Sequence, residues 1–172
     1  YQAVVVNCDH DTIERLKDCP EVERWGLSQN YGSARYGDSV LTVEYADANW
    51  MELGKKPPFT GTLPQAANEI LVERAFLDYF EIPAEVGQTI EVNLGNGKQT
   101  SGIMDVENDS RMFQLYVSEA FVEEMAQGEP LFEFRLRYTG ADSMELEQLK
   151  ADIAAFLSAN DVSEDQIFYS SN

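Results

Sequence analysis

The stretch at residues 61–103, GTLPQAANEILVERAFLDYFEIPAEVGQTIEVNLGNGKQTSGI, predicts a compact strand–helix–hairpin unit. Residues 69–72 are a short apolar run after a proline and an asparagine, which is typical of a half-buried strand. In residues 74–80 the apolar side chains recur at helical spacing, so we expect a short helix there. Pro83 prevents this helix from continuing, because proline has no backbone N–H and clashes with the preceding turn.

The second part of this stretch predicts a β-hairpin. From Gly87 to Leu94, apolar and polar residues alternate as in a strand with one buried face. Asn96-Gly97 is the turn signal, because a type I′ turn requires positive φ at both central residues. The chain then returns through residues 100–103, which we expect to form the second arm.

A fixed order of residues runs through the stretch. It reads Gly61-x-x-Pro64, Asn68-Glu69-Ile70, Val72, a short helix, Val86-Gly87-x-x-Ile90, a hairpin and Gly102-Ile103. This order resembles the MacB/FtsX-type ABC transporter permeases. In that family the pattern lies in the large extracytoplasmic domain between the first two transmembrane helices, the periplasmic core domain. The resemblance rests on sequence over this stretch and on architecture elsewhere.

The composition indicates a folded and strongly acidic chain. Its 172 residues suffice for one domain or two small subdomains, and 44% hydrophobic residues argue against disorder. A formal charge of −19, from 31 acidic and 12 basic residues, disfavours binding of nucleic acid or anionic headgroups through a basic face. No apolar run approaches the ~20 residues of a membrane-spanning helix, and no signal peptide is visible. We expect a piece of a longer chain, with the transmembrane helices of the resembled family in its flanks.

Both ends of the chain predict a strand, a capped helix and a further strand. Residues 3–6 predict a central strand buried on both faces. A capping box at residues 11–14 opens a helix whose Ile13 and Leu16 face inward. Residues 39–45 alternate between apolar and polar side chains and predict the strand that follows.

The C-terminal end repeats this order. Residues 131–138 form the clearest amphipathic strand of the chain. Residues 142–145 are expected to cap the longest helix, and residues 167–169 to form the final strand.

Three shorter elements are predicted between the ends. Residues 46–53 form a helical turn that Gly54 ends as the C′ residue. Residues 111–117 form a strand in which Met112, Leu115 and Val117 alternate loosely with other residues, and Ser118 caps the helix that follows.

These elements predict an α+β fold. Residues 1–56 and 129–172 are expected to form a porter-like subdomain from β-α-β halves at both chain ends. Residues 57–128 are expected to form an inserted, β-rich strand–helix–hairpin subdomain. The core domain of the resembled family has this organisation, although the region 22–40 is short for the family and matches none of its motifs.

The two cysteines are predicted to be free. Cys8 and Cys19 flank the first helix, and a rise of 1.5 Å per residue separates them by roughly 15 Å. A disulfide requires Cα atoms within ~7 Å, so we expect two free, largely buried thiols.

The sequence contains no recognisable catalytic or cofactor motif. His10 is the only histidine, and residues 95–98 lack the spacing of a phosphate-binding loop. Residues 105–109 carry acidic side chains at alternate positions, but Ser110 and Tyr116 stand where a calcium-binding EF-hand loop needs Gly and Glu. A solvated acidic loop is the favoured interpretation, and a looser calcium site stays open. We therefore predict no enzyme, catalytic residue, cofactor or metal ligand.

Aromatic residues in two segments are the candidates for a contact surface. The first is a loop at residues 25–36, rich in Gly and Ser, and the second is the tip around residue 61. Aromatic residues and arginine are enriched at binding hot spots, while packing beneath the loop is the equal alternative. The candidates are Trp25, Tyr31, Arg35, Tyr36, Phe59 and Leu63.

The resemblance implies the extracytoplasmic domain of an ABC transporter permease in the cell membrane, on the extracellular or periplasmic side. Such a domain couples ATP hydrolysis by a separate cytoplasmic subunit to efflux or other export, or to the handling of an envelope protein, peptide or lipid. The full-length permease is expected to be a homodimer or heterodimer, and the isolated domain a monomer. The alternative is a stand-alone, secreted or surface-anchored ligand-binding module.

Overall fold

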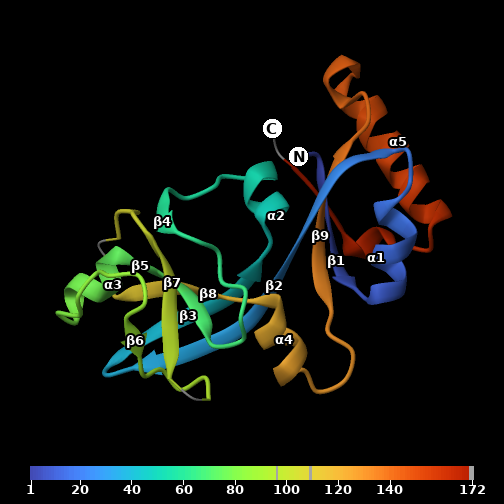
Figure 1. The fold of residues 1–172 in the computed structure, drawn as a ribbon. Coiled ribbons are helices and arrows are strands. Elements are labelled where there is room, and N and C mark those ends of the chain that lie inside the picture. The colour runs from blue at the N-terminus through green and yellow to red at the C-terminus, as the bar shows by residue number, and fades with distance from the viewer. Residues whose placement is uncertain (96, 109, 171–172) are drawn as a thin grey trace. The chain divides into compact units, whose positions relative to one another are not determined.

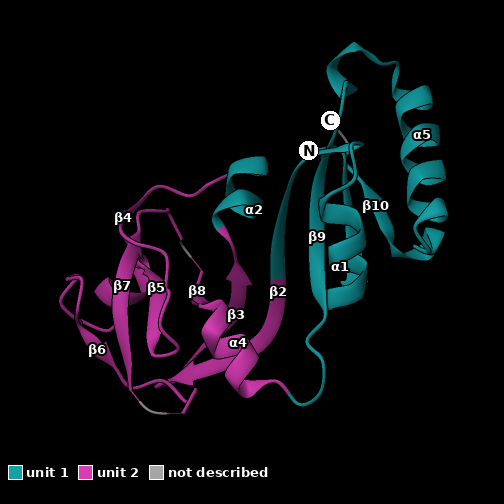
Figure 2. Ribbon diagram, turned by 45° about the vertical axis from the view of Figure 1, so that its right-hand side comes forward, with its two compact units in different colours: residues 1–28, 48–55, 127–172 teal, residues 29–47, 56–126 magenta. Residues whose placement is uncertain are grey.

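The computed structural model describes residues 1–95, 97–108 and 110–170. The chain forms two compact units, which Figure 2 shows in teal and magenta. Unit 1 contains residues 1–28, 48–55 and 127–172, and unit 2 contains residues 29–47 and 56–126. Within the described ranges, no helix is both long enough and apolar enough to cross a membrane.

Unit 1 is built from two β-α-β halves. Its elements are β1 (Ala3–Cys8), α1 (His10–Lys17), the first part of β2 (Val22–Tyr36), α2 (Ala48–Leu53), β9 (Phe132–Tyr138), η1 (Ala141–Ser143), α5 (Leu146–Ala159), η2 (Glu164–Gln166) and β10 (Ile167–Tyr169). The strands lie in the order β10-β1-β9-β2, and the three pairs are antiparallel. Helices α1 and α5 lie on one face of this sheet and α2 on the opposite face (Figure 1). The predicted α+β class with β-α-β halves is confirmed.

Strand β1 is buried on one face only, so its predicted burial on both faces is wrong. Ala3, Val5 and Cys8 are buried, whereas Val4 and Val6 remain partly exposed. The reason is that α1 and α5 cover a single face of the sheet (Figure 1). We call the other face, on which α2 lies, the open face.

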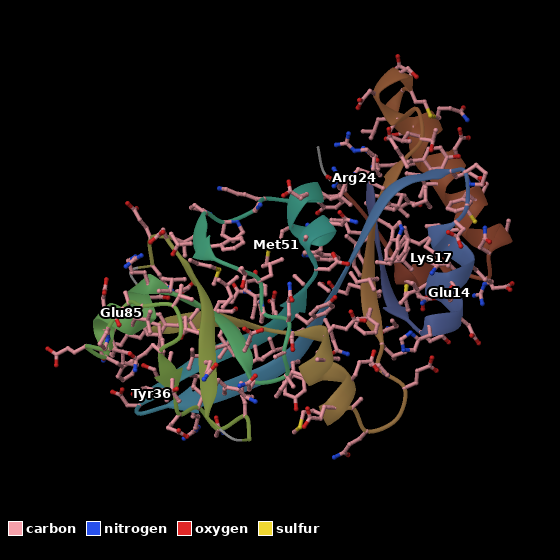
Figure 3. All side chains as sticks on the ribbon, viewed as in Figure 1. Glu14, Lys17, Arg24, Tyr36, Met51 and Glu85 are labelled. Carbon is pink, nitrogen blue, oxygen red and sulfur yellow. The ribbon has the colours of Figure 1, made fainter. Side chains whose placement is uncertain are left out.

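Helix α1 begins earlier than the sequence predicts. Its N-cap is Asp9, whose carboxylate accepts a hydrogen bond from the Thr12 N–H at 2.8 Å. This bond holds the pKa of Asp9 below its usual value. The predicted capping box two residues later is therefore wrong, while the predicted burial of Ile13 and Leu16 is confirmed. On the exposed surface of α1, Lys17 pairs with Glu14 at 3.0 Å; Figure 3 labels both.

The longest helix also differs at its start. Residues 142–145 were expected to cap it, but Ala141–Ser143 form the short helix η1. Helix α5 then begins at Leu146, and Glu145 makes no side-chain hydrogen bond as its N-cap.

Unit 2 is a mixed sheet with two short helices. Its elements are the second part of β2, β3 (Ser39–Ala46), β4 (Phe59–Gly61), β5 (Glu69–Glu73), α3 (Arg74–Tyr79), β6 (Thr89–Ile90), β7 (Lys98–Met104), β8 (Met112–Val117) and α4 (Glu119–Met125). The strands follow the order β2-β3-β8-β5-β7-β4, and β6 pairs with β7. The predicted cap of α4 is confirmed, because Ser118 accepts a hydrogen bond from the Phe121 N–H.

Residues 29–47 cluster with 56–126 rather than with the N-terminal segment. Strand β3 pairs in parallel with β8 from Val40↔Met112 to Tyr45↔Val117, which ties it to unit 2. The predicted subdomains at 1–56 with 129–172 and at 57–128 stay a prediction, and these compact units differ from them in this segment.

The predicted loop at residues 25–36 is wrong, because β2 runs without interruption from Val22 to Tyr36. Its glycines and serines have weak strand propensity, but pairing with neighbouring strands overrides local preference. Residues 22–28 pair with β9, and residue 36 leads through a two-residue turn into β3. Gly32 lies within β2 and has a φ of +131°, a backbone conformation that glycine adopts without steric cost.

The predicted hairpin is present but shorter. Thr89 and Ile90 pair antiparallel with Gln99 and Lys98, while Val92 lies outside any strand although it is buried. The predicted turn residue Asn96 lies outside the described residues.

Two burial patterns in unit 2 also differ from the prediction. The strand at residues 69–72, expected to be half-buried, is a central one: β5 lies between β7 and β8, and residues 70–73 are all buried. In β8 the buried residues are Phe113, Leu115 and Val117, which leaves Met112 68% exposed.

The glycines of the 61–103 stretch allow a close approach of two backbones. Gly61 has a φ of +84°. It lies opposite Gly102 in the antiparallel pairing of β4 with β7. A Cβ at Gly102 would lie 2.7 Å from the Thr62 carbonyl oxygen and 2.8 Å from Leu71 Cδ1. Ser101 stabilises the same close approach, because its hydroxyl donates a hydrogen bond to the Thr62 carbonyl at 3.0 Å.

Replacing Gly102 with Ala should therefore destabilise the protein by about 1–3 kcal/mol, the usual cost of adding a methyl group to a packed site. Urea unfolding followed by circular dichroism measures this free energy. Ser33→Ala, on an exposed position of β2, is the control and should change it by less than about 0.5 kcal/mol. Equal free energies of unfolding for both variants would contradict the close approach.

Both cysteines are free, as predicted, and they differ in exposure. Cys8 is buried, and burial together with the negative charge of Asp9 raises the pKa of its thiol to about 12. Cys19 lies after α1 and is partly exposed, so the prediction of largely buried thiols holds only for Cys8.

Iodoacetamide at pH 8 should therefore modify Cys19 well before Cys8 in the folded protein. With a pKa of about 12, only about one Cys8 thiol in ten thousand is ionised at this pH. Mass spectrometry of digested samples measures both rates, and the two should become similar in 8 M urea. Similar rates in the folded protein would rule out the burial described for Cys8.

Candidate functional site

Helix α2 lies against the open face of unit 1 because strand β2 has no side chain at residue 26. A Cβ on Gly26 would lie 2.1 Å from the Trp50 backbone nitrogen, which is far inside any permitted contact. Met51 and Leu53 of the same helix are buried. Glycine at this strand position therefore sets where α2 docks.

Arg135 of β9 holds α2 from the neighbouring strand. In the sheet it lies opposite Gly26, and its Nη1 donates to the Trp50 carbonyl at 2.8 Å. The guanidinium lies 3.8 Å from the centroid of the Trp50 ring and 4.2 Å from that of Tyr1. Such stacking is favourable because the ring faces carry partial negative charge.

Gly54 has a second role besides ending α2. Its N–H bonds to the carbonyls of Trp50 and Met51, which closes the helix as predicted, although its φ is not in the left-handed region. A Cβ at this position would lie 2.0 Å from Arg135 Nη1. Glycine here leaves room for the arginine, whose flexible side chain would otherwise have to move aside.

A shallow hollow of about 360 Å³ lies on the open face. Its apolar wall comes from β1 and β10, where Phe168 is 59% exposed. Its polar wall comes from β9. The hollow is lined by Val4, Val6, Trp50, Glu133, Arg135 and Phe168.

The predicted contact residues do not form one surface. Trp25 belongs to unit 1, where its ring stacks on Phe134 at 5.5 Å with an interplanar angle of 6°. It pairs with Leu136 on the sheet and so faces the covered side rather than the open face. Trp25 is therefore largely a packing residue.

The other candidates lie in unit 2, in separate surroundings. Tyr31 meets the ring of Phe121 on α4 at 5.1 Å, whereas Tyr36, labelled in Figure 3, meets Phe80 after α3 at 4.8 Å. Arg35 next to Tyr36 is exposed.

Phe59 is the first residue of the short strand β4, Leu63 follows the strand, and both are half-buried. The ammonium group of Lys56 lies 5.6 Å from the centre of the Phe59 ring. None of the six candidates is fully buried, so their role in a contact stays a prediction.

Sequence reasoning missed Trp50 and Arg135 as a pair. The alternation in residues 131–138 places Arg135 on the side away from the core. Arg135 reaches Trp50 only because β9 pairs with β2 in this register and because α2 packs on the same face of the sheet. The one local signal was the isolated Gly26 inside an aromatic and apolar run, which indicates a close backbone approach.

Catalytic geometry is not formed around the sole histidine. The His10 ring lies 6.0 Å from that of Phe132, and the His10 backbone N–H donates to Glu129 Oε1 at 3.1 Å. In the acidic loop at residues 105–109, Asp105 accepts a hydrogen bond from Arg74 Nε, and Asp109 lies outside the described residues. Among the described residues, no group of three or more His, Cys, Asp and Glu side chains is placed to hold a metal ion.

The fold of the two units resembles those of the periplasmic region of MacB and of the extracellular domain of the ABC-type transporter YknZ. The periplasmic region of MacB from Actinobacillus actinomycetemcomitans matches with a TM-score of 0.62 at 10% identity, over 98% of this chain and 87% of that one. The extracellular domain of the noncanonic ABC-type transporter YknZ from Gram-positive bacteria matches with a TM-score of 0.58 at 11% identity, over 99% and 98%.

A third similar structure is a domain of a protein from Porphyromonas gingivalis assigned as a permease. It matches with a TM-score of 0.57 at 12% identity, over 98% of this chain and 88% of that one. No protein-family model matches the sequence, and no curated protein matches it significantly. The likeness therefore lies in the fold.

Replacing Gly54 with Ala should displace the Arg135 guanidinium from Trp50, because the new Cβ occupies its place. The flexible arginine can move aside, so we expect a change in tryptophan fluorescence and a loss of only about 0.5–1.5 kcal/mol in the free energy of unfolding, the usual contribution of one hydrogen bond. In an Arg135→Met background the overlap is gone, so the same change should cost much less. Equal costs in the two backgrounds would contradict this role of Gly54.

Proposed function

We propose that this chain is the extracytoplasmic domain of an ABC transporter permease subunit and not an enzyme. The observation that supports this is the coverage of the structural match. Three domains from transporters or permeases align with 98–99% of this chain, and 87–98% of their own lengths are covered. A chance similarity of one common motif, such as a β-α-β unit, would cover only unit 1.

The residues behind the sequence resemblance support the same proposal. Gly61 and Gly87 both have positive φ, and Gly102 is packed against two carbonyl oxygens. The Glu69 carboxylate accepts hydrogen bonds from the backbone of Gln65 and Ala66 at 3.0 and 2.8 Å. These residues shape the backbone of unit 2, so the pattern behind the resemblance supports the proposal through its effect on the fold.

In this role the domain acts without a cofactor, outside the membrane, while a separate cytoplasmic subunit hydrolyses ATP. The segments 1–56 and 129–172 form the porter-like part and 57–128 the inserted part. The permease works as a homodimer or heterodimer in export or in handling an envelope protein, peptide or lipid. Tyr31, Arg35, Tyr36, Phe59 and Leu63 of unit 2, together with Trp25, are the proposed contacts to that partner.

The full-length protein should therefore co-purify with an ATP-binding subunit in mild detergent. We expect a variant lacking residues 1–172 to retain that subunit, because the domain lies on the other side of the membrane. An envelope protein that is lost with the domain is its partner. If no ATP-binding subunit is retained in several detergents, the permease proposal fails and a stand-alone ligand-binding module takes its place.

A further inference from the structure

Three arginines gather on the open face of unit 1. Arg24 of β2 lies directly opposite Arg137 of β9, and Arg135 is two residues before Arg137 on the same strand. Residues opposite each other in a sheet share a face, and so do residues two apart along a strand. Arg24 reaches Asn49 of α2 with a hydrogen bond of 3.4 Å, which fixes this side as the open face (Figure 3).

Placing two cations directly across a sheet is destabilising on its own. Because the chain has 31 acidic residues and only 12 basic ones, an Arg–Arg pair at facing positions is unexpected. Within the described residues, Arg137 Nε is buried and has no hydrogen-bond partner. Glu23 and Asp142 line a smaller hollow with Arg137, yet in the described part of the chain neither carboxylate forms an ion pair with it.

Three carboxylates lie near these arginines. Glu23 and Asp142 line the smaller hollow with Arg137, and Glu133 lines the larger one with Arg135. In the described part of the chain neither Arg24 nor Arg137 forms an ion pair with any of them, so both guanidinium groups keep hydrogen-bond donors for an anion.

An apolar surface adjoins the arginines. Along the sheet, Phe168 of β10 lies opposite Val4 of β1, and Val4 lies opposite Arg135. These side chains and Val6 form the apolar wall of the 360 Å³ hollow described above. Ligand pockets typically occupy 300–1,000 Å³, so the hollow has room for a small apolar group.

We propose that the open face of unit 1 binds an amphipathic anion, a molecule with an apolar body and a phosphate or carboxylate head. Arg137 and Arg24 hold the head, because guanidinium groups match the two oxygens of such anions with paired hydrogen bonds. The apolar body lies over Val4, Val6 and Phe168. Arg135 is a positioning residue that keeps Trp50 and α2 at the edge of the site. This proposal does not depend on the transporter role.

Titration of the chain with dodecyl phosphate tests the site, by calorimetry and tryptophan fluorescence. We expect saturable binding at one site, weakened at least tenfold by Arg137→Gln or by Arg24→Gln. Lys17→Gln on α1 removes the same charge from the covered face and should leave the affinity unchanged (Figure 3). Circular dichroism checks that each variant is folded.

Three further probes separate the two parts of the ligand and its source. Inorganic phosphate, which lacks the apolar body, and dodecyl maltoside, which lacks the charge, should each bind at least tenfold more weakly than dodecyl phosphate. Vesicles of phosphatidylglycerol distinguish a bilayer lipid, retained on them through Arg137, from a dissolved amphiphile that binds without them. Equal affinity for dodecyl maltoside, or equal loss with Lys17→Gln and Arg137→Gln, overturns the proposal.

Discussion

The packing of α2 on strand β2 is the constraint on which unit 1 depends. The backbone of Trp50 occupies the space where a side chain at residue 26 would stand. Helix α2 is the only part of unit 1 between two segments of unit 2, since residues 47 and 56 on either side both belong to unit 2. The chain therefore leaves and re-enters unit 2 through a helix fixed by Gly26, Arg135 and Gly54. Steric exclusion at two glycines and one stacked guanidinium set the position of α2 on the sheet of unit 1.

In unit 2, too, glycines allow two backbones to approach closely. Gly61 and Gly102 let β4 approach β7, and the Ser101 hydroxyl lies within hydrogen-bond distance of two carbonyl oxygens there. The two glycines also belong to the pattern through which the sequence resembles a family. Glycines at such positions carry information on how closely two backbones approach, so the pattern bears on the fold. Function has to be argued from surfaces, because an identity of 10–12% over the matched chains shows likeness in fold alone.

The elements predicted correctly from sequence are those whose cause is local. The strand at residues 131–138 follows from its alternation, and the burial of Ile13 and Leu16 from helical spacing. Strand β2 was missed because its Gly- and Ser-rich sequence is stabilised by strands far away in the chain. The candidate site could not be predicted for the same reason. Arg24, Trp50 and Arg135 meet only through sheet register and helix return.

Total charge and site charge follow different rules in this chain. A formal charge of −19 describes the long-range field, which governs solubility and encounter with other charged surfaces. Binding at contact depends on the few groups within a screening length, which here are three arginines together with the carboxylates of Glu23, Glu133 and Asp142. An anion that reaches this face meets cations that the fold has placed side by side at an energetic cost.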